Sequence, residues 1–241
     1  MTNRNRFISG LVAVVLTGAL SACHNSAAGS AEQASSAENE TESAMQNDSQ
    51  TAEAESAAAQ PQQETAGTLV IYFSRTGEQY QVGKIEKGNT AIVAEMIIET
   101  TGADSFEILP EEDYYPYTYE ELTDIAKREQ SQNARPAYAG EIPDLSKYST
   151  IFIGSPVWWG DWPMIMYTFF ENNENALAGK TLIPFSTHAG SGLSGFDRKL
   201  ASSCPNSIIG DGLAVAGQDA QNNKESVQKT VNDWLFNLGY K

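Results

Sequence analysis

From residue 67 onwards, short apolar runs alternate with segments whose apolar residues recur at helical spacing. The runs have the length and continuous apolar character of buried parallel strands, and they are 69–73, 105–109, 150–153, 181–185 and one within 208–215. The segments with helical spacing are 90–100, 119–130, 163–171, 196–202 and 219–238. This alternation predicts an α/β fold, a doubly wound five-stranded parallel sheet with helices on both faces.

The order of the strands decides which loops meet. A doubly wound sheet in the order 2-1-3-4-5 places the carboxyl ends of its first and third strands side by side at a switch point, where ligands bind. We therefore expect the functional residues in the loops that follow the first, third and fourth strands.

The loop after the first strand is suited to an anion. Ser74, Thr76 and Gly77 follow the strand directly, and Asn89 or Thr90 can cap the next helix. Hydroxyl groups and free N–H groups at a helix start form a pocket for phosphate. The alternative is an ordinary connection between a strand and a helix with a good cap.

The loop after the third strand is rich in tryptophan. Between Pro156 and Pro163 it holds Trp158, Trp159 and Trp162. Such a cluster is typical of a platform for a planar aromatic ligand, although some of these side chains can pack beneath the loop. Gly160 in the same loop tolerates a backbone rearrangement that a redox-active ligand can demand.

The loop after the fourth strand is rich in glycine. Gly190, Gly192 and Gly195 match the spacing of the dinucleotide fingerprint, but that fingerprint belongs after the first strand of a βαβ unit. A loop whose backbone N–H groups approach a ligand closely is the better interpretation. His188 is either an ordinary surface histidine or a side chain that reaches the ligand.

The three loops together resemble those of flavodoxins, and the resemblance covers nearly all of residues 67–241. Ser74-Arg75-Thr76-Gly77 is similar to the first half of the flavodoxin phosphate loop, and the closing Asn-Thr pair appears at Asn89-Thr90 after an insertion, residues 78–88.

This resemblance implies FMN as the cofactor, bound by residues of all three loops. It implies that the phosphate is held by Ser74, the Arg75 backbone, Thr76, Gly77, Asn89 and Thr90. It also implies that the ribityl chain and one side of the ring are bordered by Pro156, Val157, Trp158, Trp159 and Gly160. The other edge of the ring is then lined by Thr187, His188, Gly190 and Gly192.

The N-terminal region has a different composition. Arg4 and Arg6 precede an apolar segment, residues 7–20, that is short for a membrane span. Residues 20–23, Leu-Ser-Ala-Cys, resemble a bacterial lipobox, which implies cleavage before Cys23 and a lipid on that cysteine. The alternative is a plain secretory signal. Both interpretations place the protein outside the cytoplasm, and the first anchors it by lipid to a bacterial membrane.

Residues 24–66 are dominated by Ala, Glu, Ser and Gln, with no aromatic residue and no Lys or Arg. Such a segment cannot bury enough apolar surface to fold, so we predict a disordered tether. The chain thus divides into a signal (1–23), a tether (24–66) and a domain (67–241). The net charge of −16 argues against nucleic acid as a partner.

The leading hypothesis is an FMN-binding electron-transfer protein, more a carrier than an enzyme, that works with a redox partner protein or a membrane quinone. The alternatives are an FMN-dependent quinone reductase and a binding module on the same fold without flavin. Nucleotide hydrolysis is not expected, because residues 77–85 resemble a Walker A loop with one residue too many and lack Ser or Thr after Lys84. One histidine and one cysteine in the domain, His188 and Cys204, cannot build a histidine-rich or multi-cysteine metal site.

Overall fold

A computed structural model describes residues 67–241 except residue 113. The predicted signal (1–23) with Cys23 and the predicted tether (24–66) lie outside the described residues, so they stay predictions from sequence. Within the part of the chain that is described, no helix is both long and apolar enough to cross a membrane.

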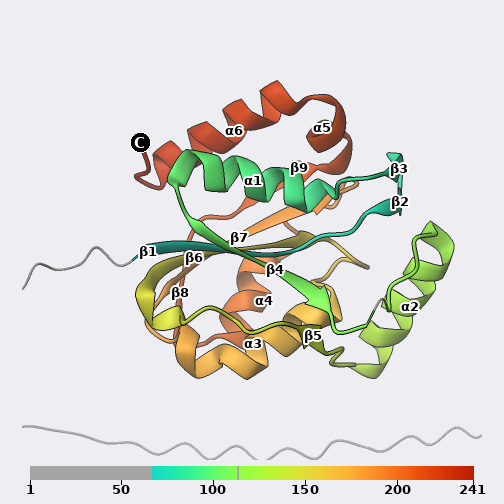
Figure 1. Cartoon of the computed structure of the whole chain (residues 1–241), viewed down its shortest axis with the longest axis horizontal. Helices are drawn as coiled ribbons and strands as arrows, with labels where there is room; N and C mark the ends of the chain where they lie inside the picture. The colour runs from blue at the N-terminus through green and yellow to red at the C-terminus, as the bar shows by residue number, and fades with distance from the viewer. Residues whose placement is uncertain (1–66, 113) are drawn as a thin grey trace, which may run out of the picture. The chain divides into compact units, whose positions relative to one another are not determined.

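A sheet of mostly parallel strands lies between two layers of helices (Figure 1). Its parallel strands are β1 (Gly67–Phe73), β4 (Asp104–Pro110), β6 (Tyr148–Pro156), β7 (Thr181–His188), β8 (Ile208–Ile209) and β9 (Leu213–Ala216). They follow the order β4-β1-β6-β7, with β8 and β9 both paired to β7, so the predicted order 2-1-3-4-5 is confirmed. A short antiparallel strand, β5 (Tyr138–Ala139), extends the edge at β4.

The predicted fifth strand is divided in two. β8 pairs with Thr181 and Leu182, and β9 pairs with residues 185–188, so the ladder is interrupted opposite Ile183 and Pro184. Proline has no N–H group to donate to a ladder, which makes this a natural place for the interruption.

The helices cover both faces of the sheet (Figure 1). The helices are α1 (Asn89–Thr101), α2 (Tyr119–Gln132), α3 (Met164–Leu177), α4 (Phe196–Ser203), α5 (Gly217–Asn222) and α6 (Lys224–Asn237), with a 3-10 turn, η1 (Leu145–Lys147). Buried side chains of α1, α5 and α6 form one core layer, and those of α2, α3 and α4 form the other. A separate hairpin, β2 (Gly77–Gln79) and β3 (Gly83–Ile85), lies between β1 and α1 in sequence.

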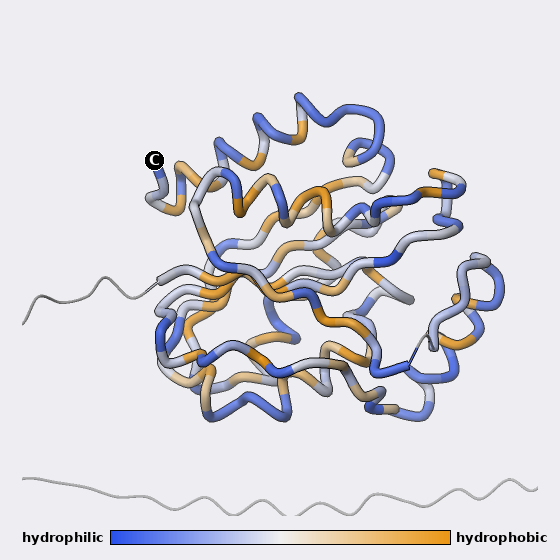
Figure 2. The backbone as a smooth tube through the Cα atoms, viewed as in Figure 1, coloured by the Kyte–Doolittle hydropathy of each residue, from blue (hydrophilic) through white to orange (hydrophobic). Residues whose placement is uncertain are grey.

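The central strand β1 shows why its sequence is apolar throughout. Leu69, Ile71 and Phe73 enter the core beneath α3 and α4, whereas Val70 enters the core beneath α1 and α6. Successive side chains of a strand point to opposite faces, so a strand covered on both sides needs apolar residues at every position. Figure 2 shows hydrophobic positions gathered along the strands and on the helix sides that face them.

Two predictions about helices were wrong. The predicted helix 219–238 is broken at Asn223, whose backbone leaves the helical region (φ −127°, ψ 42°). The Asn223 N–H still donates to the Asp219 carbonyl at 2.8 Å, so α5 ends at this residue and α6 begins directly after it. The first helix is capped by neither Asn89 nor Thr90, because Gly88 occupies its N-cap without a side-chain bond.

Candidate functional site

A cavity of about 280 Å³ lies at the carboxyl ends of the central strands β6 and β7. It is bounded by the loop after β6, the loop after β7, the start of α1, the β2–β3 hairpin and α2. The predicted site residues that line it are Asn89, Pro156, Val157, Trp158, Trp159, Gly160, Thr187, His188 and Gly190. The structure therefore brings together residues of all three predicted loops.

The other predicted residues lie beside the cavity and do not line it; they are Ser74, Arg75, Thr76, Gly77, Thr90 and Gly192. Thr90 joins the start of α1 to β7, because its hydroxyl lies 2.8 Å from the hydroxyl of Thr187. The Gly192 carbonyl accepts a bond from the Ser186 hydroxyl at 3.1 Å. The Arg75 side chain turns to the 115–117 segment, where it donates to the Pro116 carbonyl and lies 5.1 Å from the Tyr117 ring centroid.

The start of α1 fits a phosphate group. The Ser74 hydroxyl takes the place of a side-chain cap, because it accepts a bond from the Ala91 N–H at 3.0 Å. The first N–H groups of an α-helix have no acceptor within the helix and attract anions. A Cβ atom at Gly88 would lie 2.1 Å from the Ser74 hydroxyl and 2.9 Å from the Arg75 nitrogen, so the backbone closes around this cradle only because position 88 is glycine.

Trp158 forms part of the aromatic wall of the cavity. Its ring packs edge-on against Phe73 and Tyr115, with centroid distances of 5.4 Å and 5.1 Å. These contacts come from β1 and from the segment before α2, and they fix the orientation of the indole. Trp158 therefore presents a supported aromatic surface to a planar ligand.

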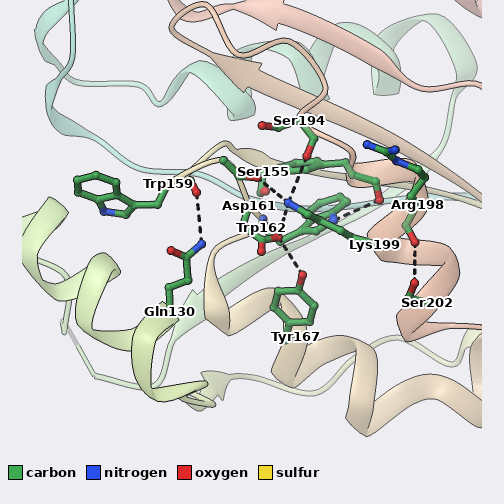
Figure 3. Close-up of polar contacts among 12 residues, drawn as sticks. Gln130, Ser155, Trp159, Asp161, Trp162, Tyr167, Ser194, Arg198, Lys199 and Ser202 are labelled. Carbon is green, nitrogen blue, oxygen red and sulfur yellow. Dashed lines mark hydrogen bonds and ion pairs between the residues drawn. The ribbon is translucent and has the colours of Figure 1, made fainter. Parts of the chain in front are cut away.

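Trp159 lies against α2 and is 52% exposed. Its indole N–H donates to the Thr123 carbonyl at 3.0 Å, and the Lys127 ammonium lies 4.7 Å from its ring centroid. Its carbonyl accepts a bond from the Gln130 amide at 3.3 Å (Figure 3). These three contacts hold Trp159 at the rim of the cavity, on the side of α2.

The third tryptophan of the loop does not belong to the platform. Trp162 is 1% exposed and stacks on Phe196 at a centroid distance of 3.6 Å. Its indole N–H donates to the Phe196 carbonyl at 3.3 Å. Trp162 is a core residue, so the expectation of a ligand platform does not extend to it.

Residues 158–161 of the loop after β6 form a tight turn. Trp158 and Asp161 exchange backbone hydrogen bonds of 2.9 Å in both directions. Trp159 and Gly160, the two central residues, have φ angles of 51° and 73°. Positive φ at both central residues is typical of a type I′ turn, and it is unusual for a tryptophan.

The polar wall of the cavity includes His188 at the end of β7. Its Nδ1 accepts a bond from the Gly190 N–H at 3.0 Å, which organises the glycine-rich loop. Burial lowers the pKa of His188, and the nearby Asp219 carboxylate opposes this effect. The imidazole is therefore neutral at pH 7, and its remaining proton lies on Nε2.

Several lining residues were not among the predicted site residues. They come from the hairpin within the insertion, from α2, from the loop after β7, from the end of β9 and from the start of α5, and they are Gln79, Tyr80, Gln81, Val82, Tyr119, Leu122, Thr123, Ala126, Ala189, Ser191, Ala216, Gly217 and Gln218. The Tyr80 and Tyr119 rings stack at 5.6 Å, and Gln218 donates to the Gln81 carbonyl at 2.8 Å. The length of the insertion at residues 78–88 was the sequence signal for the hairpin. The residues of α2 and α5 that contact the hairpin are distant in sequence, so no local signal pointed to them.

A buried carboxyl group supports the aromatic wall from below. Glu129 on α2 is 2% exposed, and its Oε2 accepts a bond from the Tyr115 hydroxyl at 3.2 Å. Tyr115 in turn packs on Trp158. Burial raises the pKa of Glu129, and the hydrogen bond from Tyr115 offsets only part of this rise.

Relative to the parent protein, Glu129→Gln is expected to gain about 1 kcal/mol of stability between pH 5 and pH 8, close to the value of one pKa unit. Because folding raises the pKa of Glu129, its protonated form favours the folded state, and this contribution declines as the pH rises through the folded pKa. Glutamine keeps an acceptor for Tyr115 and carries no charge. Urea unfolding at pH 5 and pH 8 measures the effect, with Glu120→Gln on the exposed side of α2 as control. An equal gain at both pH values would contradict the explanation.

Several solved structures have a fold similar to that of this chain. A candidate flavoprotein from Bacteroides eggerthii is 28% identical, with a TM-score of 0.56, and the match covers 73% of this chain and 99% of that one. A second, from Bacteroides uniformis, is 29% identical with a TM-score of 0.55, over 70% of this chain and 99% of that one. A flavoprotein from Lactobacillus acidophilus, solved in complex with FMN, shares the fold at 23% identity and a TM-score of 0.51, over 67% of this chain and 99% of that one.

The search of curated proteins found no match. The model of a flavodoxin family matches residues 67–234, which is most of the chain and includes every loop that borders the cavity. The chain therefore belongs to the flavodoxin family.

Proposed function

We propose that this protein binds FMN and transfers electrons between partners outside the cytoplasm. The observation that carries the proposal is the cavity at the switch point of the sheet, which combines a helix start suited to phosphate with a supported aromatic wall. The flavoproteins with related structures support a flavin, and the FMN complex of the more distant neighbour supports FMN in particular.

Each wall of the cavity has a role in this proposal. In this proposal the phosphate binds at the start of α1, where Asn89 lines the cavity. The hydroxyls of Ser74, Thr76 and Thr90 and the backbone of residues 74–77 and 88–90, which do not line the cavity, would surround the phosphate there. Trp158 supports the ring, while the N–H groups of the glycine-rich loop and the Nε2 proton of His188 face its polar edge. A bound flavin supplies the redox chemistry, and the protein binds it, orients it and excludes water from one side.

The proposed location outside the cytoplasm is based on the sequence of the N-terminal region. We propose that a lipid on Cys23 anchors the protein to the membrane and that residues 24–66 act as the tether. A redox partner protein or a membrane quinone then exchanges electrons with the flavin. Quinone reduction by the protein itself is the alternative activity.

The proposal is tested by adding FMN to the purified full chain and recording the absorbance of the flavin bands. We expect one FMN per chain, and we expect riboflavin, which lacks the phosphate, to bind at least about tenfold more weakly, a difference of about 1.4 kcal/mol. A protein that ignores FMN would overturn the proposal, and equal affinities would overturn the phosphate site. Turnover of small quinones with a reductant separates an enzyme from a carrier.

A further inference from the structure

Gln221 on α5 connects the insertion at residues 78–88 to the start of α1. Its side-chain amide nitrogen donates to the Lys87 backbone carbonyl at 2.8 Å and to Oδ1 of Asn89, also at 2.8 Å. Lys87 lies near the end of the insertion and Asn89 is the first residue of α1, so α5 lies beside the point where the insertion enters that helix (Figure 1). Asn89 lines the cavity, whereas Gln221 does not.

The Lys87 carbonyl decides how both side-chain amides are turned. A backbone carbonyl only accepts hydrogen bonds, so Gln221 must present its NH2 group to Lys87. The second proton of that NH2 group can be accepted by Asn89 only if the side-chain oxygen of Asn89 faces Gln221. The NH2 group of Asn89 is therefore turned away from Gln221.

The NH2 group of Asn89 lies on the cavity side of α5. A Cβ atom at Gly217 would lie 2.5 Å from the Asn89 Nδ2 and 3.3 Å from its Cγ, so the amide lies directly over this glycine. Gly217 and Asn89 both line the cavity. Within residues 67–112 and 114–241, no other residue accepts a hydrogen bond from this NH2 group. Its donors are therefore available to a ligand at the start of α1.

We propose that Gln221 is a positioning residue that fixes the side-chain amide of Asn89 as a donor to the phosphate of the bound cofactor. The inference rests on the proposed function. At pH 8 a phosphate monoester is mainly a dianion whose oxygens accept hydrogen bonds, so it is attracted by the NH2 group of Asn89 and repelled by its carbonyl oxygen. A free asparagine side chain presents either end, because its terminal torsion is broad and roughly two-fold. By holding one orientation, Gln221 favours a flavin with a phosphate over a flavin without one.

Gln228 on α6 provides a matched control. Its side-chain amide also reaches α1, where it donates to the Thr100 hydroxyl at 3.4 Å, but this contact is at the opposite end of α1 and Gln228 does not line the cavity. Gln221→Met and Gln228→Met remove the same group from neighbouring helices, and only the first frees the Asn89 amide. Gln221→Glu reverses the arrangement, because a carboxylate only accepts and attracts the NH2 group of Asn89 away from the phosphate.

The first measurement needs no flavin. By NMR of the full chain, the two side-chain amide protons of Gln221 are expected to exchange with water at least about tenfold more slowly than those of Gln132, whose side chain is exposed. Equal exchange would overturn the positioning role even if FMN binds normally. Slow exchange in a parent protein that binds no FMN would instead overturn the proposed function.

The second measurement compares FMN with riboflavin by fluorescence titration at pH 8. Gln221→Met is expected to bind FMN at least about fivefold more weakly than Gln228→Met does, and Gln221→Glu at least about tenfold more weakly, because a hydrogen bond to a charged group is lost. Riboflavin is expected to bind equally to all three variants. Equal FMN affinities in Gln221→Met and Gln228→Met would overturn the inference, and so would equal losses for both flavins.

Asn89→Asp decides the question if the Gln221 variants do not fold. An aspartate at position 89 still accepts the bond from Gln221, so the contacts with α5 are kept, but its second oxygen takes the place of the NH2 group. This variant is expected to bind FMN at least about tenfold more weakly than the parent and riboflavin as tightly as the parent. An unchanged FMN affinity would show that Asn89 does not donate to the phosphate.

Discussion

Gly88→Ala is expected to weaken FMN binding by at least about a hundredfold, a loss of about 2.7 kcal/mol. The added Cβ atom would lie 2.1 Å from the Ser74 hydroxyl, 2.7 Å from the Arg75 carbonyl oxygen and 2.9 Å from the Arg75 nitrogen. Two of these atoms are backbone, so the loop after β1 must move away from the start of α1. That movement separates Ser74 from the helix N–H groups that form the phosphate cradle.

The same substitution is expected to destabilise the fold by about 1–3 kcal/mol, as overpacking usually does. Gly102→Ala, at the other end of α1, is the matched control. Gly102 has a φ of 69° and no atom within 4 Å of an added Cβ, so alanine there strains the helix end without touching the cradle. We expect the control to lose about 1 kcal/mol of stability and to bind FMN as the parent does.

Fluorescence titration with FMN and urea unfolding measure both quantities. If Gly88→Ala retains the affinity of the parent, the start of α1 does not hold the phosphate. If Gly102→Ala loses as much affinity as Gly88→Ala, the effect comes from general loss of stability and the cradle argument fails.

Trp158→Ala is expected to lower both stability and FMN affinity. The indole packs against Phe73 and Tyr115, so its removal leaves a cavity beneath the loop after β6, at a cost of about 3 kcal/mol. Loss of the aromatic surface is expected to weaken FMN binding by about 1 kcal/mol or more. Urea unfolding and FMN titration measure these two effects separately.

Two other tryptophans provide the controls for this prediction. Trp162→Phe alters a core side chain that does not line the cavity, so it is expected to lower stability and preserve FMN affinity. Trp159→Ala removes a half-exposed side chain, so its cost in stability is expected to stay near 1 kcal/mol. The platform argument fails if Trp158→Ala binds FMN as tightly as Trp162→Phe does.

The sequence alone was sufficient to predict the architecture. Apolar runs such as 69–73 reveal strands buried on both faces, because every position of such a strand must be apolar, and the helical segments between them imply a parallel sheet. Once the strand order is known, the carboxyl ends of β1, β6 and β7 must lie at one edge. The loops with hydroxyls, tryptophans and glycines could therefore be assigned to one site before any side chain was placed.

Tertiary structure decided what each residue of these loops does. Trp158, Trp159 and Trp162 are alike in sequence, yet they differ in role. Trp158 forms a supported wall of the cavity, Trp159 lines its rim against α2, and Trp162 is buried against Phe196. Their roles depend on partners from α2, α4 and β1, which are far away along the chain. Local sequence does not encode such contacts.

Tertiary structure also decided how the helix α1 is capped and which side chains hold the loops of the site. A hydroxyl from the loop after β1, Ser74, caps α1 in place of Asn89 or Thr90, and Lys199 of α4 holds the carbonyl of Gly160. The sequence determined the strands, the layers and the loops, because hydrophobic burial follows a local period. Only the tertiary structure decided the hydrogen bonds made by Ser74 and Lys199, because each of them joins atoms that folding brings together from separate parts of the chain.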